Sequence, residues 1–180
     1  MQLRDYFDPG SIDLELTGAT KDEVFAEMVR LLRVDDCAQH TLLRLIQRRE
    51  QLGSTGIGRG VAVPHCRSLA VSRLRLAFGR LRTGIEYDAI DRRPVTSLFL
   101  IAAPPTEVTN QYLAVLAQIA QLVKEPDPPD RLARLETVDH FSGYSINEPD
   151  ESLPLNRGRR LRADIVDDPI DPPHLIGDPI

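Results

Sequence analysis

The run VTSLFLIAA at residues 95–103 places the strongest single constraint on the fold. It contains no charged side chain and no regular alternation of polar and apolar residues. A strand of this kind is typical of the interior of a sheet that is covered on both faces. The chain must therefore supply covering elements for two sides, and its other strong patterns are helical.

Three amphipathic helices are predicted from apolar residues at helical spacing. The first follows Thr20, which fits a capping box with Glu23. The second ends near Arg49, before Gly53, and the third stops at the prolines within residues 124–129. The apolar faces of the three helices are Val24, Met28, Leu31 and Leu32; Leu42, Leu45 and Ile46; and Tyr112, Leu116, Ile119, Ala120 and Val123.

Shorter apolar and alternating patterns predict further strands at residues 11–16, 60–63 and 73–82, with the sequences SIDLEL, GVAV and RLRLAFGRLR. A short further helix is expected from Pro129 to Glu136. Strands and helices that interleave along the chain predict an α/β fold, a sheet with covering helices.

The composition changes after Tyr144. Residues 146–180 contain no aromatic side chain, six prolines, and eight acidic against four basic residues. Such a segment has too little apolar surface to bury. We therefore expect one domain over residues 1–145 and a disordered, acidic, proline-rich tail over residues 146–180.

The N-terminal sequence MQLRDYFDPG has charges where a signal peptide needs an apolar core, and no apolar run is long enough to cross a bilayer. A cytoplasmic protein without membrane insertion is expected. Cys37 and Cys66 lack the spacing of a disulfide framework, so reduced thiols are expected, with Cys66 partly exposed. A zinc site that combines them with His65 is disfavoured because the ligand spacing has no second pair, and no metal or cofactor is expected.

Positive charge is concentrated in residues 44–93, which contain eleven arginines, no lysine and four acidic residues, a balance of +7. This region is expected to attract anions. Nucleic acid is a weak candidate, since no aromatic interleaving or known binding motif accompanies the arginines. The arginines of residues 73–82 fit the solvated face of a strand equally well.

Within this region, residues 49–67 have the sequence REQLGSTGIGRGVAVPHCR. Its glycines give the backbone unusual freedom and leave amide groups accessible to a bound anion. The spacing is not that of a Walker A loop, which needs a lysine after the last glycine, nor that of a dinucleotide fingerprint, which follows a strand. On spacing alone, a tight connection between a helix and a strand is the simpler explanation of these glycines.

His65 brings nucleophilic chemistry to this stretch. A neutral imidazole nitrogen can attack a phosphoryl group, and the phosphohistidine formed can pass the group on. Pro64 fixes the approach of the chain, and the preceding strand is expected to present His65 at its end. Arg49 and Arg67 could neutralise charge on the transferring oxygens. Composition alone would favour a structural role for a lone histidine.

The stretch resembles the active-site signature of the type-2 EIIA domains (fructose, mannitol and nitrogen-regulatory class) of the bacterial phosphoenolpyruvate-dependent phosphotransferase system. The matching elements are the RE pair, the STGIG run and the final PH pair. The similarity extends over about residues 1–142 and includes the segment YDAIDRRPV at residues 87–95. It implies a mixed central β-sheet flanked by helices on both sides.

In that family the histidine of the PH pair accepts a phosphoryl group from the carrier HPr. The histidine then passes the group to an EIIB domain, or serves as a regulatory signal in the nitrogen branch. The resemblance gives this role to His65 and that of the phosphate-stabilising arginine to Arg49. The expected phosphoryl-binding and supporting positions are Ser54, Thr55, Gly56, Ile57, Gly58, Gly60, Arg67 and Tyr112. The implied partners are an HPr-like protein and an EIIB-type domain or regulatory target, and the chain would count as an enzyme only as a phosphotransferase with a phosphohistidine intermediate.

Tyr112 stands where well-studied members carry a second histidine, near the start of the long helix. A tyrosine hydroxyl can donate a hydrogen bond to an imidazole or a phosphoryl oxygen but does not titrate near neutral pH. Ordinary core packing is an equal alternative for this side chain. Two functions stay open: a histidine phosphocarrier, and a regulatory binding module whose partner affinity depends on phosphorylation of His65, with little or no onward transfer.

Overall fold

The strand β6 (Val95–Ala103) lies in the interior of a six-stranded mixed sheet. The computed structural model of the chain describes residues 6–106, 111–124 and 132. Every residue of β6 except Thr96 is buried, as expected for a strand covered on both faces. The prediction for residues 95–103 is confirmed at both ends of the strand.

The other strands are short except for β5. They are β1 (Phe7–Asp13), β2 (Gly56–Gly58), β3 (Val61–Ala62), β4 (His65–Arg67) and β5 (Arg75–Ile85). The order across the sheet is β1-β5-β6-β3-β2, and β4 also pairs with β6. The pairs β1/β5, β3/β6 and β4/β6 are parallel, while β5/β6 and β2/β3 are antiparallel.

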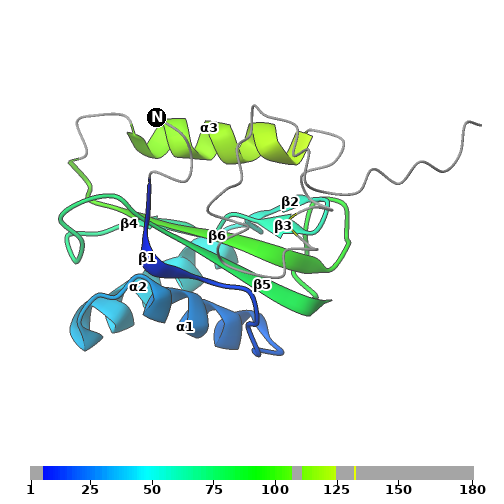
Figure 1. Cartoon of the computed structure of the whole chain (residues 1–180), viewed down its shortest axis with the longest axis horizontal. Helices are drawn as coiled ribbons and strands as arrows, with labels where there is room; N and C mark the ends of the chain where they lie inside the picture. Colours follow the sequence, from blue (N-terminus) through cyan, green and yellow to red (C-terminus); the bar gives the residue numbers. More distant parts are fainter. Residues whose placement is uncertain (1–5, 107–110, 125–131, 133–180) are drawn as a thin grey trace, which may run out of the picture. The chain divides into compact units, whose positions relative to one another are not determined.

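Helices cover both faces of this sheet (Figure 1). The helices α1 (Lys21–Leu31) and α2 (Asp36–Gln51) pack on one face, and α3 (Gln111–Lys124) packs on the other. Two separate apolar clusters result, one with residues of α1 and α2 and one with residues of α3. The predicted α/β class, with a mixed sheet and helices on both sides, is confirmed.

The ends of the first two helices follow local sequence signals. Thr20 caps α1 through the backbone N–H of Glu23, and the Glu23 carboxylate accepts from the Thr20 N–H, so the predicted capping box is present. Helix α2 ends at the cap Leu52, followed by Gly53 in the left-handed half of backbone space (φ 145°). This ending holds Arg49 in the last turn of α2, where it can reach β4.

Two predictions differ from the structure, one in the bounds of a strand and one in the buried face of a helix. Strand β1 begins earlier than the predicted span of residues 11–16, and Leu14 and Leu16 are buried just beyond its end. On α3, Ala120 is exposed, so its predicted place on the buried face was wrong. The buried side chains there are Tyr112, Val115, Ile119, Leu122 and Val123. The predictions of a helix over residues 129–136 and of a tail over residues 146–180 fall outside the described residues, apart from Leu132.

Candidate functional site

His65 is the first residue of β4 and follows Pro64, whose carbonyl accepts a hydrogen bond from the Ile101 N–H. The expectation that His65 ends the preceding strand was wrong, because β3 stops at Ala62 and His65 begins a strand of its own. Side chains alternate along a strand. Cys66 therefore packs into the core beneath α1 and α2, while the half-buried His65 ring meets Tyr112 of α3.

Two hydrogen bonds define the state of the imidazole. The Arg49 Nε–H donates to His65 Nε2 at 3.3 Å, and His65 Nδ1 lies 2.8 Å from the carbonyl oxygen of Val63. A guanidinium can only donate, so Nε2 must accept through its lone pair. The ring proton then sits on Nδ1 and is donated to Val63. The nucleophilic lone pair of His65 therefore lies on Nε2, directed at a positive charge.

Arg49 is itself held in place. Its Nη1 donates to the carbonyl oxygen of Gly53 at 2.8 Å, so two different groups fix the orientation of one planar fork. A guanidinium in this position carries further N–H groups that a phosphoryl oxygen could accept from.

Tyr112 borders the same imidazole, and Arg67 lies against Tyr112. The ring centroids of His65 and Tyr112 are 6.2 Å apart at an interplanar angle of 72°, an edge-to-face arrangement. The Arg67 guanidinium carbon lies 4.7 Å from the centre of the Tyr112 ring, within the range of a cation–π contact. Burial raises the pKa of Tyr112, with Arg67 acting in the opposite sense, so its hydroxyl stays protonated at neutral pH.

Ser54 and Thr55 lie in the loop after α2, and their hydroxyls are engaged inside the protein. Ser54 Oγ donates to the carbonyl of Tyr87 at 2.9 Å and accepts from the Gly56 N–H at 3.1 Å. Thr55 is buried and donates through its backbone N–H and its hydroxyl to Glu50. Both residues therefore shape the loop beside the site, with their side chains bound to other groups.

Gly60, in the turn between β2 and β3, lies away from the imidazole. Gly60 accepts from the Ser97 N–H, whereas His65 is in register with Ile101, so about four residues of β6, or roughly 13 Å, separate them. The glycines of residues 56–60 pack against residues 87–96. A Cβ on Gly56 would lie 2.7 Å from the Ala89 Cβ, and Gly58 and Gly60 have φ of 93° and 76°. Ile57, between them, is 38% exposed.

One polar cluster beside the site was missed from the sequence. Glu50 follows Arg49 on α2, and its side chain, 8% exposed, accepts from Lys21 Nζ at 3.0 Å as well as from Thr55. Thr55 Oγ1 is also 2.9 Å from the hydroxyl of the buried Tyr87. The sequence did place Glu50 in the RE pair of the family signature, but it gave no indication of the side chain's burial or partners.

The environment of Cys66 corrects the prediction of a partly exposed thiol. Its side chain is buried, and burial raises the pKa of the thiol to about 12, so it carries no thiolate at neutral pH. Cys37 lies on α2 and is exposed. Within the part of the chain that the structure describes, no group of three His, Cys, Asp or Glu side chains could hold a metal ion.

Most arginines of residues 73–82 bind other groups of the protein. Arg73 and Arg75 pair with Asp8, and the buried Arg80 donates to the Leu14 carbonyl. These contacts fasten β1 and the segment after it to β5. The solvated strand face considered for residues 73–82 holds for Arg73 and Arg82, whose side chains are 62% and 74% exposed, but not for Arg75 and Arg80.

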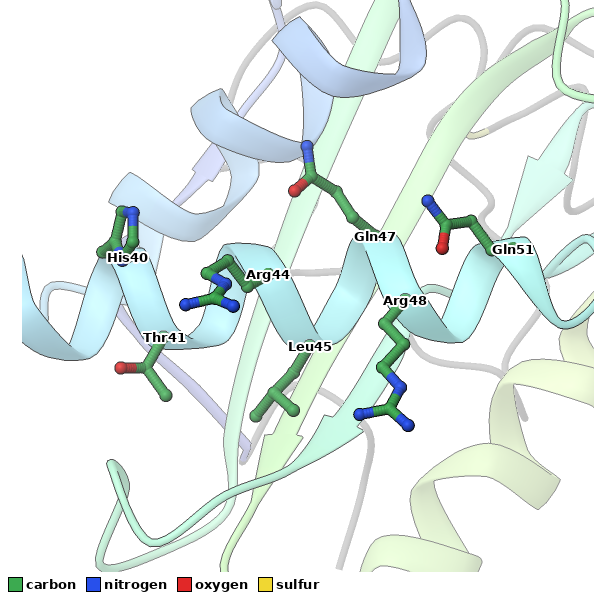
Figure 2. Close-up of a pocket in the computed structure, with 7 residues that line it drawn as sticks. All are labelled: His40, Thr41, Arg44, Leu45, Gln47, Arg48 and Gln51. Atoms are coloured by element: carbon green, nitrogen blue, oxygen red, sulfur yellow. The ribbon is translucent and has the colours of Figure 1, made fainter.

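A hollow of about 470 Å³ lies along the outer side of α2 (Figure 2). His65 is not among the residues that line it, so this hollow is separate from the candidate site. The lining residues are His40, Thr41, Arg44, Leu45, Gln47, Arg48 and Gln51.

The helices of the described residues were also compared with the length and hydropathy that a membrane span requires. None of them meets both requirements.

Comparisons with known proteins agree on one family. Residues 5–144 match the family described as phosphoenolpyruvate-dependent sugar phosphotransferase system, EIIA 2. The chain is 30% identical over 141 residues to a nitrogen regulatory protein of Pseudomonas aeruginosa, covering 77% of this chain and 91% of that protein. It is 32% identical over 130 residues to a fructose-specific EIIA component of Haloferax volcanii, covering 70% and 82%.

Solved structures give the same result. The nitrogen regulatory protein IIA-Ntr of Neisseria meningitidis superposes with a TM-score of 0.71 at 27% identity, covering 78% of this chain and 97% of that one. The mannitol enzyme IIA of Escherichia coli, solved in complex with phosphorylated mannitol enzyme IIB, shares the fold at 20% identity with a TM-score of 0.60, covering 75% and 93%. The chain therefore belongs to the EIIA 2 family of the phosphoenolpyruvate-dependent sugar phosphotransferase system.

Proposed function

We propose that this chain is a histidine phosphocarrier that accepts a phosphoryl group on Nε2 of His65. The observation that carries the proposal is the pair of hydrogen bonds on the ring, in which Val63 holds Nδ1 and leaves the Nε2 lone pair facing Arg49. Residues 5–144 match a family of phosphotransferase components, which supports the same reaction.

In the proposed step, the Nε2 lone pair forms a bond to phosphorus as the bond from phosphorus to the donor breaks. The donor is proposed to carry the group on a histidine of the HPr-like protein. The electron pair of the broken bond returns to the ring nitrogen of that histidine, so the phosphoryl group passes from one imidazole to the other. The Val63 carbonyl, 2.8 Å from Nδ1, stabilises the positive charge that spreads over the His65 ring. The Nδ1–H stays in place throughout.

Arg49 has two roles in this step. Its Nε–H occupies the space in front of Nε2, 3.3 Å away, where the phosphorus must arrive. The guanidinium therefore shifts off the nitrogen as the group enters and then donates to the phosphoryl oxygens. Arg67 adds a second positive charge, and the protonated Tyr112 hydroxyl is a further donor.

Protein partners are proposed to dock around His65. Three leucines near the site residues in sequence are exposed: Leu52 (81%), Leu69 (87%) and Leu113 (58%). Exposed leucines beside a polar site suit a transient protein contact. We propose an HPr-like donor and an EIIB-type acceptor in the cytoplasm, and the solved complex of a mannitol enzyme IIA with its enzyme IIB supports the acceptor.

The test is a labelling reaction with phosphoenolpyruvate, enzyme I and HPr. The protein is expected to gain one acid-labile phosphate, and His65→Ala is expected to gain none. No labelling under conditions that label a known EIIA domain, or full labelling of His65→Ala, would overturn the proposal.

A regulatory binding module remains the second candidate. It is favoured by the similarity to the nitrogen regulatory proteins of two organisms. In this case phosphorylated His65 would set the affinity for a target protein, with little onward transfer. A chase of the labelled protein with EIIB domains separates the two functions: a carrier loses its label to one of them, whereas a regulatory module keeps it.

A further inference from the structure

A buried polar network lies behind the candidate site and joins four parts of the chain. Glu50 of α2 accepts from Lys21 of α1 at 3.0 Å through Oε1. Its Oε2 accepts from the Thr55 N–H at 2.9 Å and from the Thr55 hydroxyl at 2.7 Å. The Tyr87 hydroxyl lies 2.9 Å from the same Thr55 oxygen. Both carboxylate oxygens of Glu50 are thus satisfied.

Because these groups are buried, the network is stable only when its hydrogen bonds are all formed. A carboxylate that is 8% exposed is costly unless it is paired and hydrogen-bonded. Tyr87 is 1% exposed, and burial raises the pKa of its hydroxyl, which keeps it protonated. Because the Thr55 hydroxyl gives its proton to Glu50, the Tyr87 hydroxyl is the donor to Thr55. Lys21 also lies 4.6 Å from the centre of the Tyr87 ring. A displacement of Thr55 would therefore leave several buried groups unsatisfied.

The network fixes the loop of residues 53–55. This loop is linked to each ring nitrogen of His65 through one other residue, Arg49 for Nε2 and Val63 for Nδ1. The Gly53 carbonyl accepts from Arg49 Nη1, and Arg49 Nε donates to Nε2. The Thr55 carbonyl accepts from the Val63 N–H at 2.9 Å, and the Val63 carbonyl binds Nδ1. The loop therefore sets the position of the Val63 carbonyl, which accepts from Nδ1, and of the Arg49 guanidinium, which donates to Nε2.

We infer that Glu50, Thr55 and Tyr87 are positioning residues, which act through this loop to hold His65 as the Nδ1–H tautomer, so that Nε2 carries the lone pair that the phosphoryl group needs. The inference rests on the proposed function for its catalytic meaning. Its structural content, the tautomer of His65, can be measured in the unphosphorylated protein.

The experiment compares Thr55→Val, which removes the hydroxyl and keeps the shape, with Thr55→Ser, which keeps the hydroxyl. Nitrogen-15 NMR of the histidine rings, at a pH where His65 is neutral, reports which ring nitrogen carries the proton. Thr55→Val is expected to lower the share of the Nδ1–H tautomer and to slow phosphorylation by roughly tenfold or more, because the variant loses the two buried hydrogen bonds of the hydroxyl, to Glu50 and to Tyr87. Thr55→Ser is expected to match the wild type in both.

Two further variants complete the design. Thr96→Val is the matched control, because the Thr96 hydroxyl bonds to Gly60 in the turn between β2 and β3, and its tautomer and rate are expected to stay unchanged. Tyr87→Phe removes only the far hydroxyl of the network and is expected to change the tautomer in the same direction as Thr55→Val. It also serves as the test if Thr55→Val does not fold.

A folded Thr55→Val protein, or in its place a folded Tyr87→Phe protein, with the wild-type tautomer and rate would overturn the inference. Failure of the proposed function looks different. In that case the wild type takes up no phosphate at all, while the tautomer measurements on the same set of variants still decide whether the network positions His65.

Discussion

At the scale of single residues, the proposed reaction depends on Arg49, because its guanidinium lies in front of the His65 lone pair. A guanidinium that donates to both Gly53 and Nε2 is already oriented before a phosphoryl group arrives. Once the guanidinium has moved off Nε2, its N–H groups can act on the charge that develops on the phosphoryl oxygens during transfer.

Arg49→Gln is expected to slow phosphorylation of His65 by roughly 10²–10³-fold, the range for loss of one preorganised charge-stabilising donor. Arg49→Lys is expected to fall between that variant and the wild type, since an ammonium keeps the charge but loses the planar fork. The rate of phosphate uptake from phosphorylated HPr measures both. The matched control is Arg48→Gln, which removes the same charge from the exposed neighbouring position on α2. Equal rates for Arg48→Gln and Arg49→Gln would contradict the assigned role.

Sequence reasoning could select His65 and Arg49 but not their geometry. The motif places both residues in one stretch, whereas the tautomer depends on the Val63 carbonyl, which no pattern of side chains reveals. The same limit applies to Glu50. Its burial results from the packing of Lys21 and Tyr87, far away in sequence, against the end of α2.

At the scale of elements, the hairpin of residues 56–60 explains most of the glycines in the motif. A hairpin that packs this closely on residues 87–96 leaves no room for a side chain at Gly56. The glycines therefore build the edge of the sheet that precedes the site, and the anion-binding role expected for their amides stays a prediction.

Gly56→Ala is expected to lower the free energy of unfolding by about 1–3 kcal/mol, the usual cost of overpacking, because the new Cβ would meet the backbone and side chain of Ala89. Urea denaturation measures this loss. The folded variant is expected to take up phosphate at close to the wild-type rate. A variant of wild-type stability that is phosphorylated much more slowly would instead favour a direct role for this glycine at the phosphoryl group.

Elements with strong local signals were predictable, and those that depend on tertiary pairing were not. The apolar run of β6 and the capping box of α1 were both located correctly. Strand β4, only three residues long, exists because it pairs with the end of β6, and its own composition carries no strand signal. For the same reason β1 extends over Phe7–Asp13, where β5 offers a parallel partner.

At the scale of the whole molecule, charge is distributed differently from what its sum along the sequence suggests. The balance of +7 over residues 44–93 does not form one surface, because Arg73, Arg75 and Arg80 bind groups of β1 or just beyond it. Arg49 binds His65, and Arg67 lies against Tyr112 beside it. The positive charge that serves the proposed reaction is therefore local to the site.

The most direct test of phosphorylation at Nε2 is to locate the phosphoryl group on the imidazole ring of His65. The protein, labelled with nitrogen-15 in its histidines, is phosphorylated through enzyme I and HPr and examined by NMR, where couplings within the imidazole distinguish the two nitrogens. A single phosphohistidine is expected at His65, with phosphorus on Nε2 and a proton still on Nδ1. Phosphorus on Nδ1, or on another histidine such as His40, would contradict it.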